Sequence, residues 1–143
     1  MDFYSQYKFK FYLNATHAIY IDGKCGAPHP HTWEIILHTV KMEEEFIRFH
    51  EVEEQIEGYL EKYQNRFINE IPPFDILNPT LEYITQFMLE QFQNILNPTG
   101  WVIFTIEVSE TPTRSYIIST VENNCITQLM KENHAKKIIE DSF

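Results

Sequence analysis

Polar and apolar residues alternate in two stretches of the first forty residues. Every second residue from Phe9 to His17 falls on one face, and all but His17 are apolar, which predicts a half-buried strand over residues 8–17. Trp33 and two following apolar residues on the same parity predict a second strand over about 31–41. Pro28 and Pro30 interrupt regular pairing, so the chain around His29 is predicted to be irregular.

The middle of the chain changes to helical spacing. An apolar stripe through Val52, Ile56 and Leu60 predicts an amphipathic helix over about 51–64. Thr80 is a plausible N-cap for a second helix, which ends at the Pro and Gly of residues 97–100. Residues 65–77 are predicted to be a loop.

Alternation returns over residues 101–110 and again over 116–121, which predicts two more strands. The order strand, strand, helix, helix, strand, strand, with short turns between paired strands, favours an α+β fold. In it, a four-stranded antiparallel sheet carries both helices on one face. Apolar residues from Cys125 onward suggest a short C-terminal helix. We therefore divide the chain into a domain over 1–124 and an extension over 125–143.

Charge and cysteine content narrow the possible partners. The 143 residues have a formal net charge of −10, which argues against a nucleic acid or an anionic membrane as partner. No apolar run approaches the length of a membrane span. Cys25 and Cys125 are far apart in the sequence, and a disulfide between them is not expected. We therefore expect a cytoplasmic protein.

The residues that suggest chemistry lie at the junction of the first two strands. His29 and His31 are two apart, so in an extended chain their rings point the same way, and His17 ends the neighbouring predicted strand. Three imidazoles from adjacent strands suit a catalytic zinc ion with an open fourth position. Cys25, next to Lys24, is a candidate general base. Spacing alone leaves open that these histidines are ordinary surface or packed residues.

The pattern resembles a known family. His17 followed by Lys24-Cys25-Gly26-x-x-His29-x-His31 is similar to the signature of the 6-pyruvoyltetrahydropterin and 6-carboxytetrahydropterin synthases, and its spacing is closer to the 6-carboxy, queuosine-pathway branch. The resemblance covers about residues 9–121. It implies the tunnelling fold, in which trimers, often doubled to hexamers, close a continuous barrel.

The resemblance also implies roles for individual residues. The three histidines would hold zinc and Cys25 would be the catalytic base. The segment from Asn78 to Glu82 resembles a helix start beside the pterin, where Thr80 lies. Glu110 would anchor the pterin, with Thr111 nearby, because one carboxylate can accept from two adjacent ring N–H donors.

One departure from the family pattern bears on activity. The family has an Asp-His pair after its first helix, whereas this chain has Gln64-Asn65, and amides cannot carry a proton at ordinary pH. Loss of a general acid or base typically costs about 10²–10⁴ in rate. His50 is a candidate substitute, although a histidine at a helix start is more often simply exposed.

The sequence therefore predicts a zinc-dependent lyase acting on 7,8-dihydroneopterin triphosphate or a related pterin, with an altered proton relay. Two alternatives remain open. One is a paralogue that binds a metal and a pterin-like or purine-like ring without turnover, and the other is an oligomer that keeps the metal only for stability. Zinc suits the ligand set, but iron or nickel is chemically possible.

Overall fold

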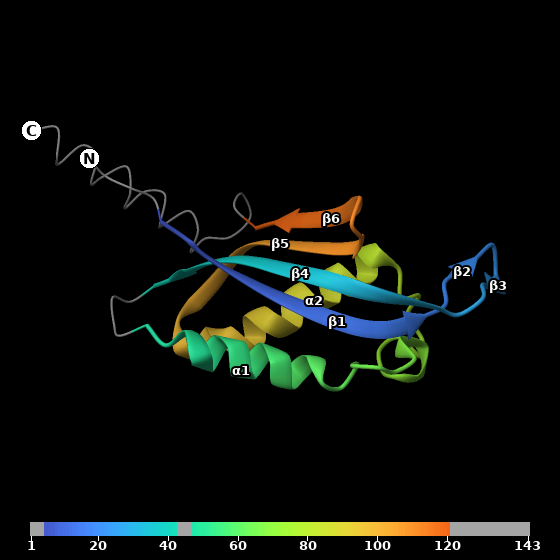
Figure 1. The fold of residues 1–143 in the computed structure, drawn as a ribbon, viewed down its shortest axis with the longest axis horizontal. Helices are drawn as coiled ribbons and strands as arrows, with labels where there is room; N and C mark the ends of the chain where they lie inside the picture. The colour runs from blue at the N-terminus through green and yellow to red at the C-terminus, as the bar shows by residue number, and fades with distance from the viewer. Residues whose placement is uncertain (1–4, 43–46, 121–143) are drawn as a thin grey trace, which may run out of the picture.

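The structure, a computed structural model, describes residues 5–42 and 47–120. Its centre is an antiparallel sheet in the order β1-β4-β5-β6, and α1 and α2 lie together on one side of it (Figure 1). The predicted α+β architecture is confirmed. The elements are β1 (Tyr7–His17), β2 (Tyr20–Ile21), β3 (Lys24–Cys25), β4 (His29–Lys41), α1 (Phe49–Leu60), η1 (Ile68–Glu70), α2 (Leu81–Leu96), η2 (Asn97–Thr99), β5 (Trp101–Thr111) and β6 (Arg114–Ser119).

The apolar parity of β1 and of β4 up to Leu37 faces the helices and forms the core, whereas Val40, Val102 and Phe104 form a second buried cluster beyond the register shift between His38 and Thr39. Leu13 pairs with Trp33 across β1 and β4, and Phe11 pairs with Ile35. Each of these four side chains is at most 3% exposed. Burial of one such side chain contributes about 1.5–3 kcal/mol, so the apolar face of each strand is held against the helices. The histidines at the strand ends have the same parity as these apolar residues and therefore lie on the same face. The helices cover this face with Val52, Ile56, Leu60, Leu81, Ile84, Met88, Phe92 and Leu96.

Three elements differ from the sequence prediction by two or more residues at a boundary. The first helix ends at Leu60 rather than residue 64, because the backbone turns at 61–65 although Tyr63 remains buried and so continues the apolar spacing. The second long strand begins at His29 rather than 31, with Pro30 paired opposite Thr16. The last strand covers Arg114–Ser119 rather than 116–121. Val121 and the predicted C-terminal helix lie outside the described residues.

A short hairpin lies between β1 and β4 and is not among the elements predicted above. β2 and β3 are joined by Asp22 and Gly23, whose φ angles of 52° and 77° are those of a two-residue type I′ turn. The amide of Gly26 donates to the carbonyl of Ile19 at 2.9 Å, and a Cβ at residue 26 would lie only 3.2 Å from that oxygen. The hairpin that carries Cys25 is therefore closed at both ends.

No helix within residues 5–42 and 47–120 combines the length and the apolar character that crossing a membrane would need.

Candidate metal centre

The three predicted histidines converge where β1 ends and β4 begins. His17 pairs directly with His29, and His31 follows two residues later on the same face. Their ring centroids lie 4.5–5.0 Å apart. Trp33 packs against two of these rings, with centroids 5.0 Å from His17 and 5.2 Å from His31. Strand pairing therefore places the three imidazoles on one face and next to one another.

A fourth potential ligand, Glu110, comes from β5. The pairing of β5 with β6 shifts register at Glu110: Ser109 pairs with Ser115, and Thr111 pairs with Arg114. Such irregularities commonly redirect a side chain. The carboxylate of Glu110 lies 3.4 Å from Nε2 of His31. One ligand atom from each of the three histidines and from Glu110 falls within 4.8 Å of all the others.

The histidines are oriented as metal ligands usually are. Nδ1 of His17 lies 2.8 Å from the carbonyl oxygen of Pro79, and Nδ1 of His29 lies 3.1 Å from that of Ala27. A carbonyl can only accept, so each Nδ1 carries the proton and each Nε2 keeps its lone pair. Nε2 of His17 and Nε2 of His31 are buried without any hydrogen-bond partner. Buried polar atoms of this kind are rare, and a bound cation would satisfy both.

Burial also keeps two of these rings in their ligand form. Desolvation lowers the pKa of His17 below its ordinary value of 6.5, and it outweighs the opposing effect of the Pro79 carbonyl. Desolvation likewise lowers the pKa of His31, although the nearby Glu110 carboxylate acts in the opposite direction. Both imidazoles are therefore neutral at pH 7, as metal binding requires.

These lowered pKa values predict how the metal-free protein responds to acid. Below pH 6.5 the unfolded chain takes up protons at residues 17 and 31 before the folded chain does, so stability falls as the pH drops. We expect the melting temperature of the metal-free protein to fall between pH 7.5 and pH 5. His17→Gln, which cannot titrate there, should flatten this dependence. Equal slopes for parent and variant in thermal unfolding would contradict the assignment.

Two asparagine side chains hold the segment between the metal site and the hairpin. Asn69 accepts from the amide of Ala18 at 2.9 Å and donates to the carbonyl of the same residue at 2.8 Å. Asn78 bonds both backbone groups of Tyr20 in the same way, at 2.9 and 3.0 Å. These paired bonds connect the loop before α2 to the chain that leads from His17 to Cys25.

Removing one of these asparagine side chains should loosen the segment that leads from His17 into the hairpin. Asn69→Ala leaves a part-buried amide and carbonyl of Ala18 without partners, which should cost roughly 1–3 kcal/mol of stability. We expect faster hydrogen exchange at residues 18–26 and a lower free energy of unfolding. Asn94→Ala, on an exposed position of α2, is the matched control. If the two variants unfold alike, the paired bonds are not stabilising.

The remaining predicted site residues occupy different positions. Cys25 is exposed on β3 and does not belong to the group of four clustered side chains. Thr80 is the N-cap of α2, where its hydroxyl accepts from the amide of Tyr83 at 3.2 Å. Thr111 lies 3.4 Å from the hydroxyl of Thr113 and lines a cavity with Glu110.

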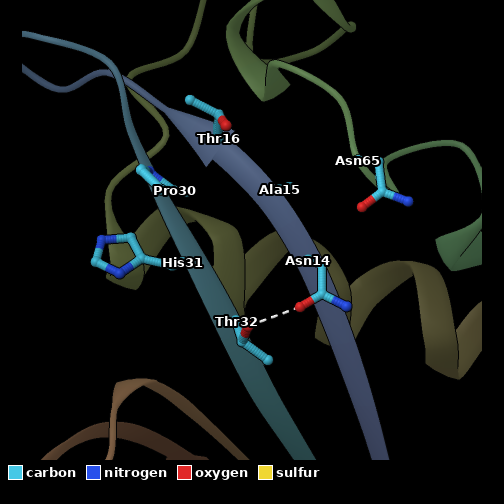
Figure 2. A pocket seen from close by; sticks show the side chains of 7 residues that line it. All are labelled: Asn14, Ala15, Thr16, Pro30, His31, Thr32 and Asn65. Atoms are coloured by element: carbon cyan, nitrogen blue, oxygen red, sulfur yellow. Dashed lines mark hydrogen bonds between the residues drawn. The ribbon is translucent and has the colours of Figure 1, made fainter.

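Cavities adjoin His31 on two sides. One, of about 460 Å³, brings together the ends of β1 and β4 and the loop residue Asn65 (Figure 2). In this view Asn14 accepts from the hydroxyl of Thr32, a bond of 2.6 Å. The other cavity, of about 600 Å³, is lined by Tyr12, Pro30, His31, Thr32, Glu34, Ser109, Glu110, Thr111 and Pro112. Both volumes lie in the range of small-molecule sites.

The side chain of Gln64 is turned to the backbone of β1, whereas Asn65 lines the smaller cavity. The amide of Gln64 accepts from the backbone of Asn14 at 2.9 Å and donates to the carbonyl of Tyr12 at 2.8 Å. Asn65 has a φ of 59°, and its backbone N–H donates to the carbonyl of Asn14. Gln64 therefore braces the outer edge of β1.

The fold and the site together define a class of protein. Its members have an antiparallel sheet backed by two helices, and three histidines and a glutamate meet at the ends of the strands. The chain belongs to the 6-pyruvoyl tetrahydropterin synthase family, whose model matches residues 6–121. Members of this family are lyases.

Solved structures agree on the fold. The synthase from Caenorhabditis elegans is 13% identical, with a TM-score of 0.67 over 80% of this chain and 94% of that one. The synthase from Plasmodium falciparum is 20% identical, with a TM-score of 0.58 over 80% and 98%. An uncharacterized protein from Wolinella succinogenes is 13% identical, with a TM-score of 0.60 over 81% and 99%. No curated protein gives a significant match.

Some contributors to the site were not found from the sequence. The carbonyl of Pro79, which orients His17, is a backbone group and leaves no residue-type signal. Trp33 was used only to define one face of its strand, although it also packs against the histidine rings. The bonds of Asn69 and Asn78 to the backbone of Ala18 and Tyr20 join distant parts of the sequence, so no local pattern predicts them.

Proposed function

We propose that this protein is a zinc-dependent pterin synthase that eliminates triphosphate from 7,8-dihydroneopterin triphosphate or a related pterin. The observation that carries the proposal is the pair of buried, unpartnered Nε2 atoms on His17 and His31, in a chain of this family. Imidazole ligands favour zinc among the common divalent ions available in cells. The spacing from Cys25 to His31 favours the 6-carboxy branch.

In this proposal each residue has one task. His17, His29 and His31 hold the zinc, which when bound acidifies substrate hydroxyl groups. Glu110 accepts two ring N–H bonds through its carboxylate, and the cavity of about 600 Å³ beside it has room for a pterin. Thr111 lines the same cavity, and the family resemblance implies that Thr80 lies beside the ring.

Cys25 is proposed to remove a proton from the substrate side chain. Its exposure on the hairpin leaves the thiol accessible to a substrate that reaches over the metal. A reduced thiol fits the cytoplasm, which is the proposed location.

The assembly proposed is a homotrimer, or a hexamer built from two trimers. The strands β1 and β6 are the edges of the sheet. The segment from Gln64 to Arg66 already bonds the β1 edge between Tyr12 and Thr16, whereas Ile117 on β6 is 56% exposed. Exposed strand edges invite pairing with another chain, and closure of three sheets into a barrel would remove all of them. Sedimentation of the purified protein tests this, and a monomer at micromolar concentration would contradict it.

The test of function is turnover with defined variants. Zinc-loaded protein incubated with 7,8-dihydroneopterin triphosphate should release triphosphate. Cys25→Ala should lower the rate by about 10²–10⁴ and leave the zinc content unchanged. Cys125→Ala is the matched control and should retain the parent rate. Equal rates for Cys25→Ala and the parent protein would remove this thiol from the mechanism.

A second candidate function is supported by the contacts of Gln64. Its amide is engaged with the backbone of β1, and neither it nor Asn65 can carry a proton. The alternative is a paralogue that binds a metal and a pterin-like or purine-like ring without turnover. Ring binding measured by pterin fluorescence, together with zinc binding but without triphosphate release, would favour it. Zinc binding without ring binding would favour a structural metal.

A further inference from the structure

The carboxylate of Glu110 has an unusual set of neighbours. Its side chain is only 9% exposed, and one oxygen, Oε1, lies 3.4 Å from Nε2 of His31 and 3.7 Å from Nη2 of Arg114. The Arg114 side chain is 65% exposed, so its interaction with the carboxylate is weakened by solvent. A nearly buried carboxylate thus points at a histidine rather than at water.

The contact with His31 is not a hydrogen bond. Nε2 of His31 is buried and has no hydrogen-bond partner, although the oxygen is close. Two ligand atoms on a tetrahedral zinc ion, each about 2.0–2.1 Å from the metal, lie about 3.3 Å apart. The observed separation of 3.4 Å therefore matches the edge of a coordination tetrahedron.

The local backbone supports the same interpretation. Glu110 falls where the β5–β6 register shifts between Ser109 and Thr111, so it has no directly opposite residue on β6. Shifts of this kind re-aim a side chain and are common beside functional sites. Here the result is that one ligand atom of Glu110 lies within 4.8 Å of one ligand atom on each of the three histidines.

We propose that Glu110 is itself the fourth ligand of the metal while no substrate is bound. Carboxylate oxygen is an ordinary zinc ligand, and three histidines with one glutamate complete a four-coordinate site. One consequence rests on the proposed function: the Glu110 carboxylate must leave the metal before it can anchor the ring. Ring binding would then open the coordination position that the substrate side chain requires.

Zinc affinity in the absence of any pterin is the readout that tests the metal ligation. Metal-free full-length protein is titrated with zinc against a chromophoric chelator. Glu110→Gln should weaken zinc binding at least about tenfold, because even residues outside the ligand shell typically contribute about 10–100-fold. Glu107→Gln, the same substitution on the same strand but outside the cluster, should bind as the parent does. Glu110→Asp should recover part of the loss.

A zinc-loaded crystal structure separates ligation from a simple effect of charge. We expect a Glu110 oxygen about 2.0–2.2 Å from the zinc in the parent protein without substrate. A water molecule in that position, or equal zinc affinities for the parent and Glu110→Gln, would overturn the inference. Normal ligation by Glu110 with no release of triphosphate would instead refute only the proposed lyase activity.

Discussion

Replacing His29 with alanine is expected to lower zinc affinity at least about a hundredfold while leaving the fold intact. The residue supplies one of three imidazoles, and even outer-shell partners of a metal typically contribute about 10–100-fold to its affinity. His29 is only half-buried at the start of β4, and its Nδ1 bonds the carbonyl of Ala27 in an exposed loop. The change therefore removes a ligand without opening the core. Chelator competition measures the affinity, and thermal unfolding of the metal-free protein measures the fold.

Two further variants make this result specific. His17→Ala should lose zinc as well, but it should also destabilise the metal-free protein by about 1–3 kcal/mol, because the buried carbonyl of Pro79 loses its donor. His38 lies on the same strand as His29 but on the opposite face, so the His38→Ala variant should retain zinc. If His29→Ala binds zinc as tightly as His38→Ala, the three histidines do not form a metal site.

The sheet and the relative parity of the histidines were predictable because both depend on alternation. A period of two places His29, His31 and Trp33 on one face, and the apolar residues of β1 place His17 on the same face of its neighbour. Burial of one face then leaves one register. The pattern could not show where the first helix ends, because buried Tyr63 keeps helical spacing after the backbone has turned.

The fourth member of the cluster shows where pattern reasoning stops. Glu110 has the same parity as the apolar residues Ile106 and Val108, and the family resemblance implies that its carboxylate binds the ring. Its approach to His31 depends on the register shift beside Thr111, and no residue type at that position predicts such a shift. The bonds of Asn69 to Ala18 and of Asn78 to Tyr20 likewise join residues about fifty to sixty positions apart.

The second large effect concerns the pair of amides after the first helix. Converting Gln64-Asn65 to Asp-His, the pair that the family resemblance implies, is expected to raise triphosphate release by about 10²–10⁴-fold, the usual contribution of a general acid or base. Asn65 and His31 both line the cavity of about 460 Å³, with β1 and β4 between their side chains in the view of Figure 2, so the expected gain requires the new imidazole to reach the substrate across this cavity. Steady-state kinetics with zinc-loaded protein measures the change.

The backbone can accept both substitutions. Asn65 has a φ of 59°, and histidine is one of the few residues besides glycine that is enriched in this left-handed region. Aspartate at position 64 can still accept from the amide of Asn14, but it loses the bond that Gln64 donates to Tyr12. That loss should cost about 0.5–1.5 kcal/mol, which thermal unfolding would detect.

The single variants decide how the pair works. Asn65→His alone supplies a proton carrier without the carboxylate that orients it, so it should recover only part of the gain. Gln64→Asp alone should show the stability cost and little gain in rate. If the double variant is no faster than the parent protein, and the parent itself releases triphosphate, then proton transfer in this chain runs through another group, and His50 on α1 is the first to replace.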